Sequence, residues 1–142
     1  MKRHPSLIPL SRFHRSVLFL ALVCKKNAPP VKGYPTDLEG KRDYAISFYH
    51  GPLKKHIHTE ENRLFPTVSG KNAELDQMIF ELKEEHGLLD QLFKKLGQST
   101  QLFNDLDELG QLLEKHVRKE ERQFFQLIQA SFSEEELLAI RL

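Results

Sequence analysis

The feature that most constrains this chain is a ten-residue pattern that occurs twice. Residues 56–65 read HIHTEENRLF and residues 116–125 read HVRKEERQFF. Both copies begin with His and a β-branched apolar residue, reach Glu-Glu after two variable positions, and end with an apolar residue and Phe. A repeat of this length is hard to ascribe to chance in so short a chain. In each copy a His precedes a Glu by four residues, which places both side chains on one face of a helix.

The apolar residues around each pair predict that this face points into a core. Steps of three or four residues are typical of a core-facing helix stripe. In the later helix the stripe is Leu102, Leu106, Leu109, Leu113, His116, Glu120, Phe124 and Leu127, and in the earlier helix it is Ala45, Tyr49, Leu53, His56, Glu60 and Leu64. A buried, unpaired carboxylate is costly or takes up a proton, so something must compensate it.

Two more histidines occur on stripes of the same kind. His86 is the only polar member of the stripe Leu75, Ile79, Leu82, His86, Leu89, Phe93 and Leu96, and His14 belongs to the stripe Leu10, His14, Val17, Ala21 and Cys24. The chain therefore predicts four helices, each with one inward His, and two of them with a Glu one turn later. Four imidazoles and two carboxylates inside a helical bundle are a ligand set for a pair of divalent transition metal ions.

This pattern resembles the hemerythrin-like (HHE cation-binding) domains. The resemblance rests on LSRFHRSVLFLAL at 10–22, FYHGPLKKHIHTEENRLFP at 48–66, EEH at 84–86 and LEKHVRKEERQFF at 113–125. It implies an all-α, up-down-up-down four-helix bundle around a non-haem di-iron centre, with zinc or manganese as substitutes for the two iron ions. The metal ligands that it implies are terminal histidines at His14, His56, His86 and His116, and bridging carboxylates at Glu60 and Glu120.

The sequence departs from the oxygen carriers of this family at two points. They have a second His one turn after the first on the third helix, where this chain has Asp90. They also use a carboxylate five residues after the last His, whereas this chain has both Glu120 and Glu121. We prefer Glu120, because Glu60 already sets the four-residue spacing. Asp90, Glu61 and Glu121 stay open as supporting residues around the metal.

A site with fewer imidazoles has more coordination positions open to small molecules. The expected function is therefore binding or sensing of O2, NO or peroxide, or the handling of iron. The sequence has no motif for a nucleophile or a phosphate loop, so a binding protein is favoured over an enzyme. The alternative is a metal-free or zinc-filled helical bundle that acts as a protein-interaction module. Ferritin-like bundles are the rival architecture, but they place Glu before His at a three-residue spacing.

Composition narrows the class of protein further. The 142 residues predict a single domain over 1–142, and 21 basic against 20 acidic residues do not suggest nucleic acid as a partner. The single cysteine, Cys24, favours a reducing compartment, and we expect a cytoplasmic protein. The apolar run 17–23 is too short to span a membrane, and we interpret it as part of the first helix rather than a signal segment. The sequence leaves open whether the chain has a protein partner.

Turn and capping residues predict where the helices begin and end. Pro5 and Pro9 are expected to delay the first helix until Ser11, and it should end near Lys26. Thr36 with Glu39 predicts a capping box for the second helix, which should bend at Gly51-Pro52 and stop at Pro66. The later helices are predicted over 72–97, from 99 or 100 to about 130, and, as a short fifth helix, from Ser133. His4, His50 and His58 lie off the stripes and are expected at the surface.

Overall fold

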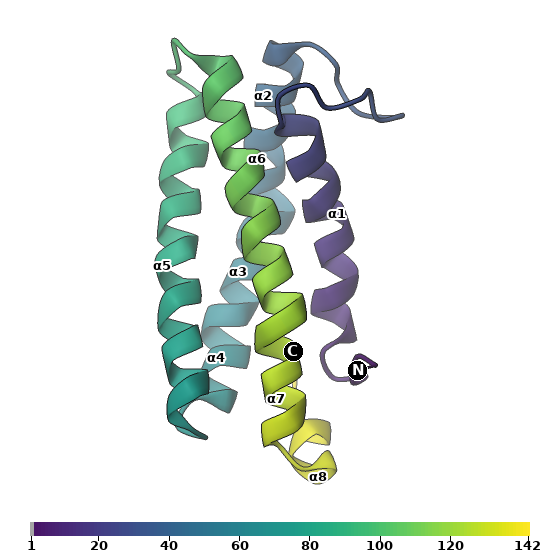
Figure 1. The fold of residues 1–142 in the computed structure, drawn as a ribbon, viewed down its shortest axis with the longest axis vertical. Coiled ribbons are helices and arrows are strands. Elements are labelled where there is room, and N and C mark those ends of the chain that lie inside the picture. Colours follow the sequence, from purple (N-terminus) through teal and green to yellow (C-terminus); the bar gives the residue numbers. More distant parts are fainter. Residues whose placement is uncertain (1) are drawn as a thin grey trace.

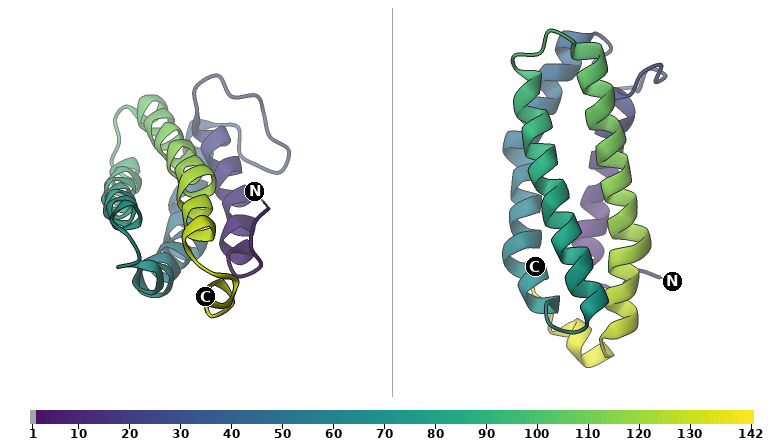
Figure 2. Two further views of the ribbon diagram at one scale, coloured as in Figure 1. Left: turned by 60° about the horizontal axis from the view of Figure 1, so that its bottom comes forward. Right: turned by 60° about the vertical axis from the view of Figure 1, so that its left-hand side comes forward.

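The computed structural model describes residues 2–142 and shows an all-α bundle (Figures 1 and 2). The elements form four long helices and a short fifth one. The long helices run up, down, up and down, and the fifth helix closes the end of the bundle at which the chain begins (Figure 1). The elements are α1 (Ile8–Cys24), α2 (Leu38–Phe48), η1 (Tyr49–Leu53), α3 (Lys54–Thr59), η2 (Glu60–Leu64), α4 (Phe65–Val68), α5 (Ala73–Leu96), α6 (Leu102–Lys119), η3 (Glu120–Phe124), α7 (Phe125–Ser131) and α8 (Glu134–Leu138). The segments η1, η2 and η3 are π-helical turns within longer helices.

The first helix begins earlier than its prolines predicted. It starts at Ile8, and Pro9 occupies its first turn. Proline is tolerated there because the first amides of a helix have no intrahelical acceptor. The prediction that Ser11 begins the helix was therefore wrong. Ser11 instead uses its hydroxyl to donate to Glu121, at 2.8 Å from Oε2.

The second long helix is continuous from Leu38 to Val68. Neither its first nor its last residue is the predicted one. Asp37, rather than Thr36, caps it by accepting from the Gly40 amide at 3.0 Å. The predicted bend at Pro52 is a π-helical turn, η1. Pro66 does not stop the helix, because it lies at the start of α4 just after the η2 turn. The helix ends at Val68, where Ser69 adopts an extended backbone.

The remaining helices agree closely with their capping residues. Asn72 caps α5 by accepting from the Leu75 amide, and Gln101 rather than Ser99 or Thr100 precedes α6. Ser133 and Glu136 form the predicted capping box of α8. Within residues 2–142, no helix has both the length and the hydrophobicity needed to cross a bilayer.

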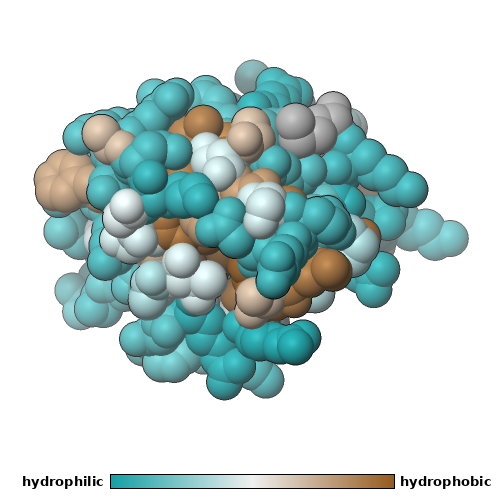
Figure 3. Space-filling model, turned by 90° about the horizontal axis from the view of Figure 1, so that it is seen from below, coloured by the Kyte–Doolittle hydropathy of each residue, from teal (hydrophilic) through white to brown (hydrophobic). Residues whose placement is uncertain are grey.

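Two apolar clusters fill the bundle, one toward each end. The cluster near the chain ends includes Leu10, Leu64, Leu82 and Phe124, and Leu137 of α8 covers it. The other cluster includes Val17, Leu53, Leu89 and Leu113. In each long helix the predicted His or Glu residues fall between these clusters in sequence, so they form a polar layer in mid-bundle. Seen from below, the end of the bundle shows apolar side chains between mostly hydrophilic ones (Figure 3).

A candidate metal centre

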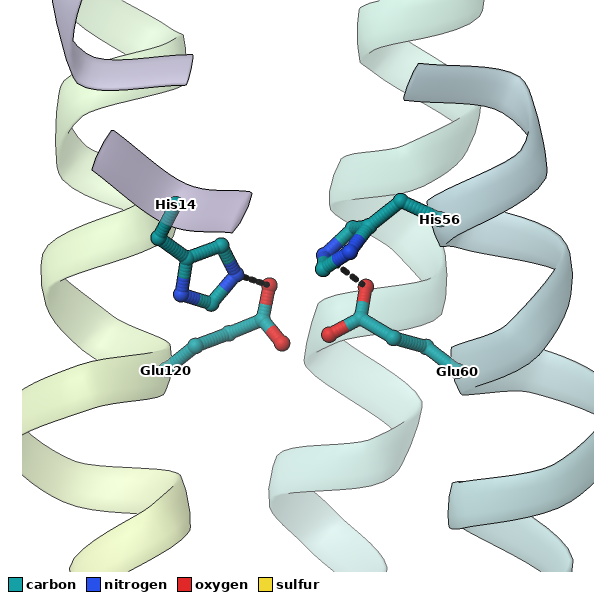
Figure 4. Close-up of side chains that lie close together, drawn as sticks. All are labelled: His14, His56, Glu60 and Glu120. Carbon is teal, nitrogen blue, oxygen red and sulfur yellow. Dashed lines mark ion pairs between the residues drawn. The ribbon is translucent and has the colours of Figure 1, made fainter. Parts of the chain in front are cut away.

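The six predicted ligand residues meet in this polar layer. His14 comes from α1, His56 and Glu60 from the second long helix, His86 from α5, and His116 and Glu120 from the fourth. All six side chains are buried, and both glutamates are fully inaccessible to solvent. Figure 4 shows the carboxylates of Glu60 and Glu120 pointing toward each other, each beneath an imidazole.

The ligand atoms form two groups that share the glutamates. One group contains His14 and His56, the other contains His86 and His116, and Glu60 and Glu120 belong to both. Within each group all ligand atoms lie within 4.8 Å of one another. The distances from each imidazole Nε2 to its nearer carboxylate Oε1 are 3.8 Å for His14, 3.5 Å for His56, 3.3 Å for His86 and 2.8 Å for His116. This arrangement suits two cations with two shared carboxylates.

The polar atoms of the layer lack partners within the protein. Nε2 of His14, His56 and His86 and both carboxylate oxygens of Glu60 and Glu120 are buried without a hydrogen bond among the described residues. The 2.8 Å contact between His116 and Glu120 is not aligned as one. Each unsatisfied buried polar group costs about 1–3 kcal/mol, and more when charged. The missing partners all point into one place, and metal ions of this donor preference would satisfy them together.

Three of the four imidazoles are held from behind by carboxylates. Nδ1 of His14 lies 2.6 Å from Glu121, Nδ1 of His86 lies 2.6 Å from Glu61, and Nδ1 of His116 lies 2.7 Å from Glu85. A proton on Nδ1, donated to the carboxylate, leaves Nε2 free as an acceptor for a metal. The second Glu of each HxxxEE copy thus reaches to a His on a neighbouring helix.

Two of these three carboxylates also pair with basic residues near the surface of the bundle. Glu121 accepts from Arg3 at 3.1 Å and from Ser11, and Glu85 accepts from Lys119 at 2.9 Å. Burial raises the pKa of both carboxyls, but their hydrogen bonds outweigh it and the pKa of each is lowered. Both groups are therefore charged at neutral pH and suited to hold an imidazole N–H.

His56 differs from the other three imidazoles. Among the described residues no carboxylate contacts its Nδ1; instead its ring stacks on Phe13 with 4.6 Å between centroids. Burial lowers the pKa of His56 to about 3, so it is neutral and open to a metal at pH 7. His116 shows the opposite behaviour. Burial lowers its pKa, but the Glu120 and Glu85 carboxylates outweigh this effect and raise the pKa to about 9.

The carboxyl groups of the shared pair repel each other. Burial and the neighbouring Glu120 charge raise the pKa of Glu60 well above its usual value. Without a cation, one proton therefore stays on this pair. A metal ion would replace that proton and balance both charges.

Other polar residues that the sequence singled out lie away from the ligand atoms. Asp90 accepts a hydrogen bond from Tyr49 and pairs with Lys94 at 2.8 Å, and it belongs to neither ligand group. His50 and His58 are exposed as predicted. His4 is buried, contrary to prediction, because its ring contacts Ser6 at 2.8 Å and Glu134 at 3.0 Å.

Sequence reasoning missed one residue of the layer, Glu85. It precedes His86 on α5 but points to α6, where it contacts His116. The signal was a Glu beside an inward His, on the flank that faces the next helix. The apolar pattern of one helix does not predict which neighbouring helix that flank will contact.

Comparison with known proteins agrees with this geometry. The family model described as the hemerythrin HHE cation binding domain matches residues 18–128. His14 precedes the matched range, yet α1 places it beside His56, with 5.0 Å between ring centroids. No curated protein and no solved structure gives a significant match. The family match covers well over half of the sequence, and the chain therefore belongs to the hemerythrin HHE cation-binding domain family.

Proposed function

We propose that the protein holds two iron ions in the polar layer and uses them to bind or sense a small molecule such as O2, NO or peroxide, or to handle iron. The observation that carries this proposal is the set of buried, unpartnered ligand atoms in two groups with shared glutamates. Imidazole and carboxylate donors without thiolate suit iron, and they also accept zinc or manganese.

The space beside the ligands supports a small molecule rather than an organic substrate. A cavity of about 10 Å³ lies within the layer, lined by ligand residues that include Glu60 and Glu120 and by apolar side chains that include Val17, Leu53 and Leu113. About this volume is needed for one water-sized molecule. Bound iron would supply a change of oxidation state and an open coordination position for the small molecule.

The roles of the protein side chains follow from their contacts. The four imidazoles and two carboxylates fix the positions of the cations, and the aliphatic walls keep bulk water away from them. Glu61, Glu85 and Glu121 fix the ring orientation of three of the four histidines. The chain needs no large movement to assemble this set of groups.

Metal content and thermal stability test the proposal together. Protein purified from iron-supplemented cells should contain about two metals per chain, and the His116→Ala variant should contain less. A bound metal at about 100 times its Kd stabilises the native state by about 2.7 kcal/mol. For a chain of this size this corresponds to a fall in Tm of roughly 5–10 °C after treatment with a chelator.

Spectra and ligand titration separate the possible outcomes. Iron predicts a visible absorption spectrum in air that changes when the anaerobically reduced protein is titrated with O2 or NO. A colourless protein with zinc would contradict the redox function. Less than one metal per chain, with a Tm that a chelator does not change, would support the metal-free interaction module instead.

The cellular setting is a separate proposal. Cys24 is buried on α1, and the described chain has no second cysteine with which to pair. We propose a reducing compartment, the cytoplasm, and a single domain over residues 1–142. Small ligands are the proposed partners, without nucleic acid or a membrane.

A further inference from the structure

A wide groove on the outside of the bundle leads toward the candidate metal centre. It lies between the second long helix and α5, has a volume of about 490 Å³, and reaches Glu61 and His86 at its inner wall. Gly87 lines the groove without a side chain. A Cβ at that position would project into open space and meet no atom within 4 Å, so a larger residue would narrow the groove. The groove thus brings solvent up to the Glu61–His86 contact.

One side chain borders both this groove and the small inner cavity. Ile57 lines both spaces, and no other described residue does so. It is half-buried and follows directly on His56. Rotation of an isoleucine side chain is a small, fast movement compared with the opening of a helical bundle. Ile57 is therefore in position to open and close a passage.

The charge of the groove selects what enters it. Lys54 and Lys83 line the groove, are exposed, and form no ion pair within the described chain. Glu61, the acid among the lining residues, contacts His86 at 2.6 Å and keeps its charge, so the two lysines leave the groove with an excess of one positive charge. A cleft with positive walls raises the local concentration of anions and repels cations. The mouth therefore favours a small anion over a cation.

We propose that this groove is the entry route for small ligands, that Ile57 is its gate, and that Lys54 and Lys83 favour anions over cations, while neutral ligands such as O2 and NO enter without electrostatic attraction. This proposal rests on the proposed function, because it names the ligand class and route for the same site. Only the anion preference depends on charge, whereas the gate acts on every ligand. The two parts can thus be measured separately.

The first experiment measures the entrance without any metal. The thiol introduced by Ile57→Cys is treated with methanethiosulfonate reagents that carry an anionic or a cationic group. The thiolate attacks the reagent sulfur, a disulfide forms, and methanesulfinate leaves. Burial raises the pKa of the native Cys24 thiol to about 12, so this thiol stays unreactive. Mass spectrometry follows the labelling.

The anionic reagent should react at least several-fold faster than the cationic one at low salt. Adding Lys83→Glu to the same variant should reverse this order, and high salt should remove it. Lys115→Glu is the matched control, because Lys115 is exposed on another face of the bundle. Equal rates for the two reagents, or equal effects of the two charge reversals, would overturn the anion preference.

The second experiment uses the metal-loaded protein and stopped-flow mixing with azide, an anion, and nitric oxide, a neutral ligand. Ile57→Ala should raise both association rates several-fold, and Gly87→Leu should lower both by narrowing the groove. Lys54→Glu with Lys83→Glu should lower the azide rate about tenfold or more at low salt and leave nitric oxide unchanged. Leu92→Ala, at a half-buried leucine in the groove between α5 and α6, is the control.

The two proposals fail in different ways. If the wild-type protein contains metal and binds both ligands, but Ile57→Ala behaves like Leu92→Ala, the gate is refuted and the function stands. If the wild-type protein holds no metal, the function is refuted, while the labelling experiment still decides whether the groove attracts anions. Tm and metal content of every variant show that a changed rate does not come from misfolding.

Discussion

The two ligand groups use similar residues but are built differently. We name them the α1/α3 half-site, with His14 and His56, and the α5/α6 half-site, with His86 and His116; both share Glu60 and Glu120. In the α5/α6 half-site both imidazoles have a carboxylate on Nδ1, at 2.6 and 2.7 Å. In the α1/α3 half-site only His14 has one, and His56 stacks on Phe13.

This difference shows that a repeated motif does not make equal sites. His56 and His116 occupy the same position in the two HxxxEE copies, yet His56 stacks on the ring of Phe13, whereas His116 has a carboxylate near each of its two nitrogens. A carboxylate behind an imidazole fixes its orientation and makes it a stronger ligand. We therefore expect the α5/α6 half-site to hold its metal more firmly than the α1/α3 half-site.

The largest effect should come from a residue that both half-sites share. Glu60→Gln keeps the size of the side chain but removes a charge from both ligand groups, and it should lower metal content from about two to less than one per chain. Elemental analysis measures this. Glu84→Gln is the control, because Glu84 is exposed on α5 beside Glu85. If Glu60→Gln retains one full metal, the glutamate belongs to one half-site only and the shared arrangement is wrong.

A smaller effect should appear when the carboxylates behind the imidazoles are removed one at a time. Loss of such a group typically lowers metal affinity about 10–100-fold. With a competing chelator, the wild-type protein should release metal in two phases. Glu85→Gln should speed the slow phase, which we assign to the α5/α6 half-site, and Glu121→Gln should speed the fast phase. Release in one phase from the wild-type protein would contradict the difference between the half-sites.

The last effect concerns pH. His116, between Glu120 and Glu85 and beside His86, has a pKa raised to about 9, so at pH 7 it carries a proton that a metal must displace. His56, with a pKa near 3, has none to lose. The affinity of the α5/α6 half-site should therefore rise by about tenfold per pH unit between pH 7 and 9 for each proton released.

Calorimetry in buffers of different ionisation enthalpy counts the released protons. The contribution of the His116 proton should fall away above pH 9, because the free imidazole then has none to displace. Proton release from wild-type protein that stays the same from pH 7 to above pH 9 would show that the two imidazoles start in the same state. This outcome would remove the pH difference between the half-sites.

The apolar spacing was sufficient to predict the four helices and the six inward polar residues, but not the register after each glutamate. The spacing predicts that the later stripe reaches Leu127, whereas the structure buries Ile128 and leaves Leu127 partly exposed. The reason is the π-helical turn η3, in which the Phe125 amide donates to the Glu120 carbonyl and one extra residue enters the turn. A rule based on regular helical spacing does not predict such a turn or the shift of one residue that it causes.

Contacts between distant parts of the chain account for the other differences. His4 is buried because Glu134 of α8 and Gln129 of α7 reach the N-terminal segment, and no local pattern reports this. Glu85 was missed because its partner is on the next helix. The cap of α2 moved by one residue because Asp37 competes with Thr36 for the same role.

The meeting of both chain ends at one end of the bundle has a consequence for topology. Leu7 and Leu142 pack in the same apolar cluster, and Gln129 donates to the Lys2 carbonyl at 2.8 Å. A short linker could join the ends, and the exposed connection between α1 and α2 could then be opened to give a circular permutant. In such a chain α1 would be synthesised last, so His14 would follow the other ligand residues instead of preceding them. Comparing the permutant with the natural chain would show whether cation uptake during synthesis depends on the order in which the helices emerge.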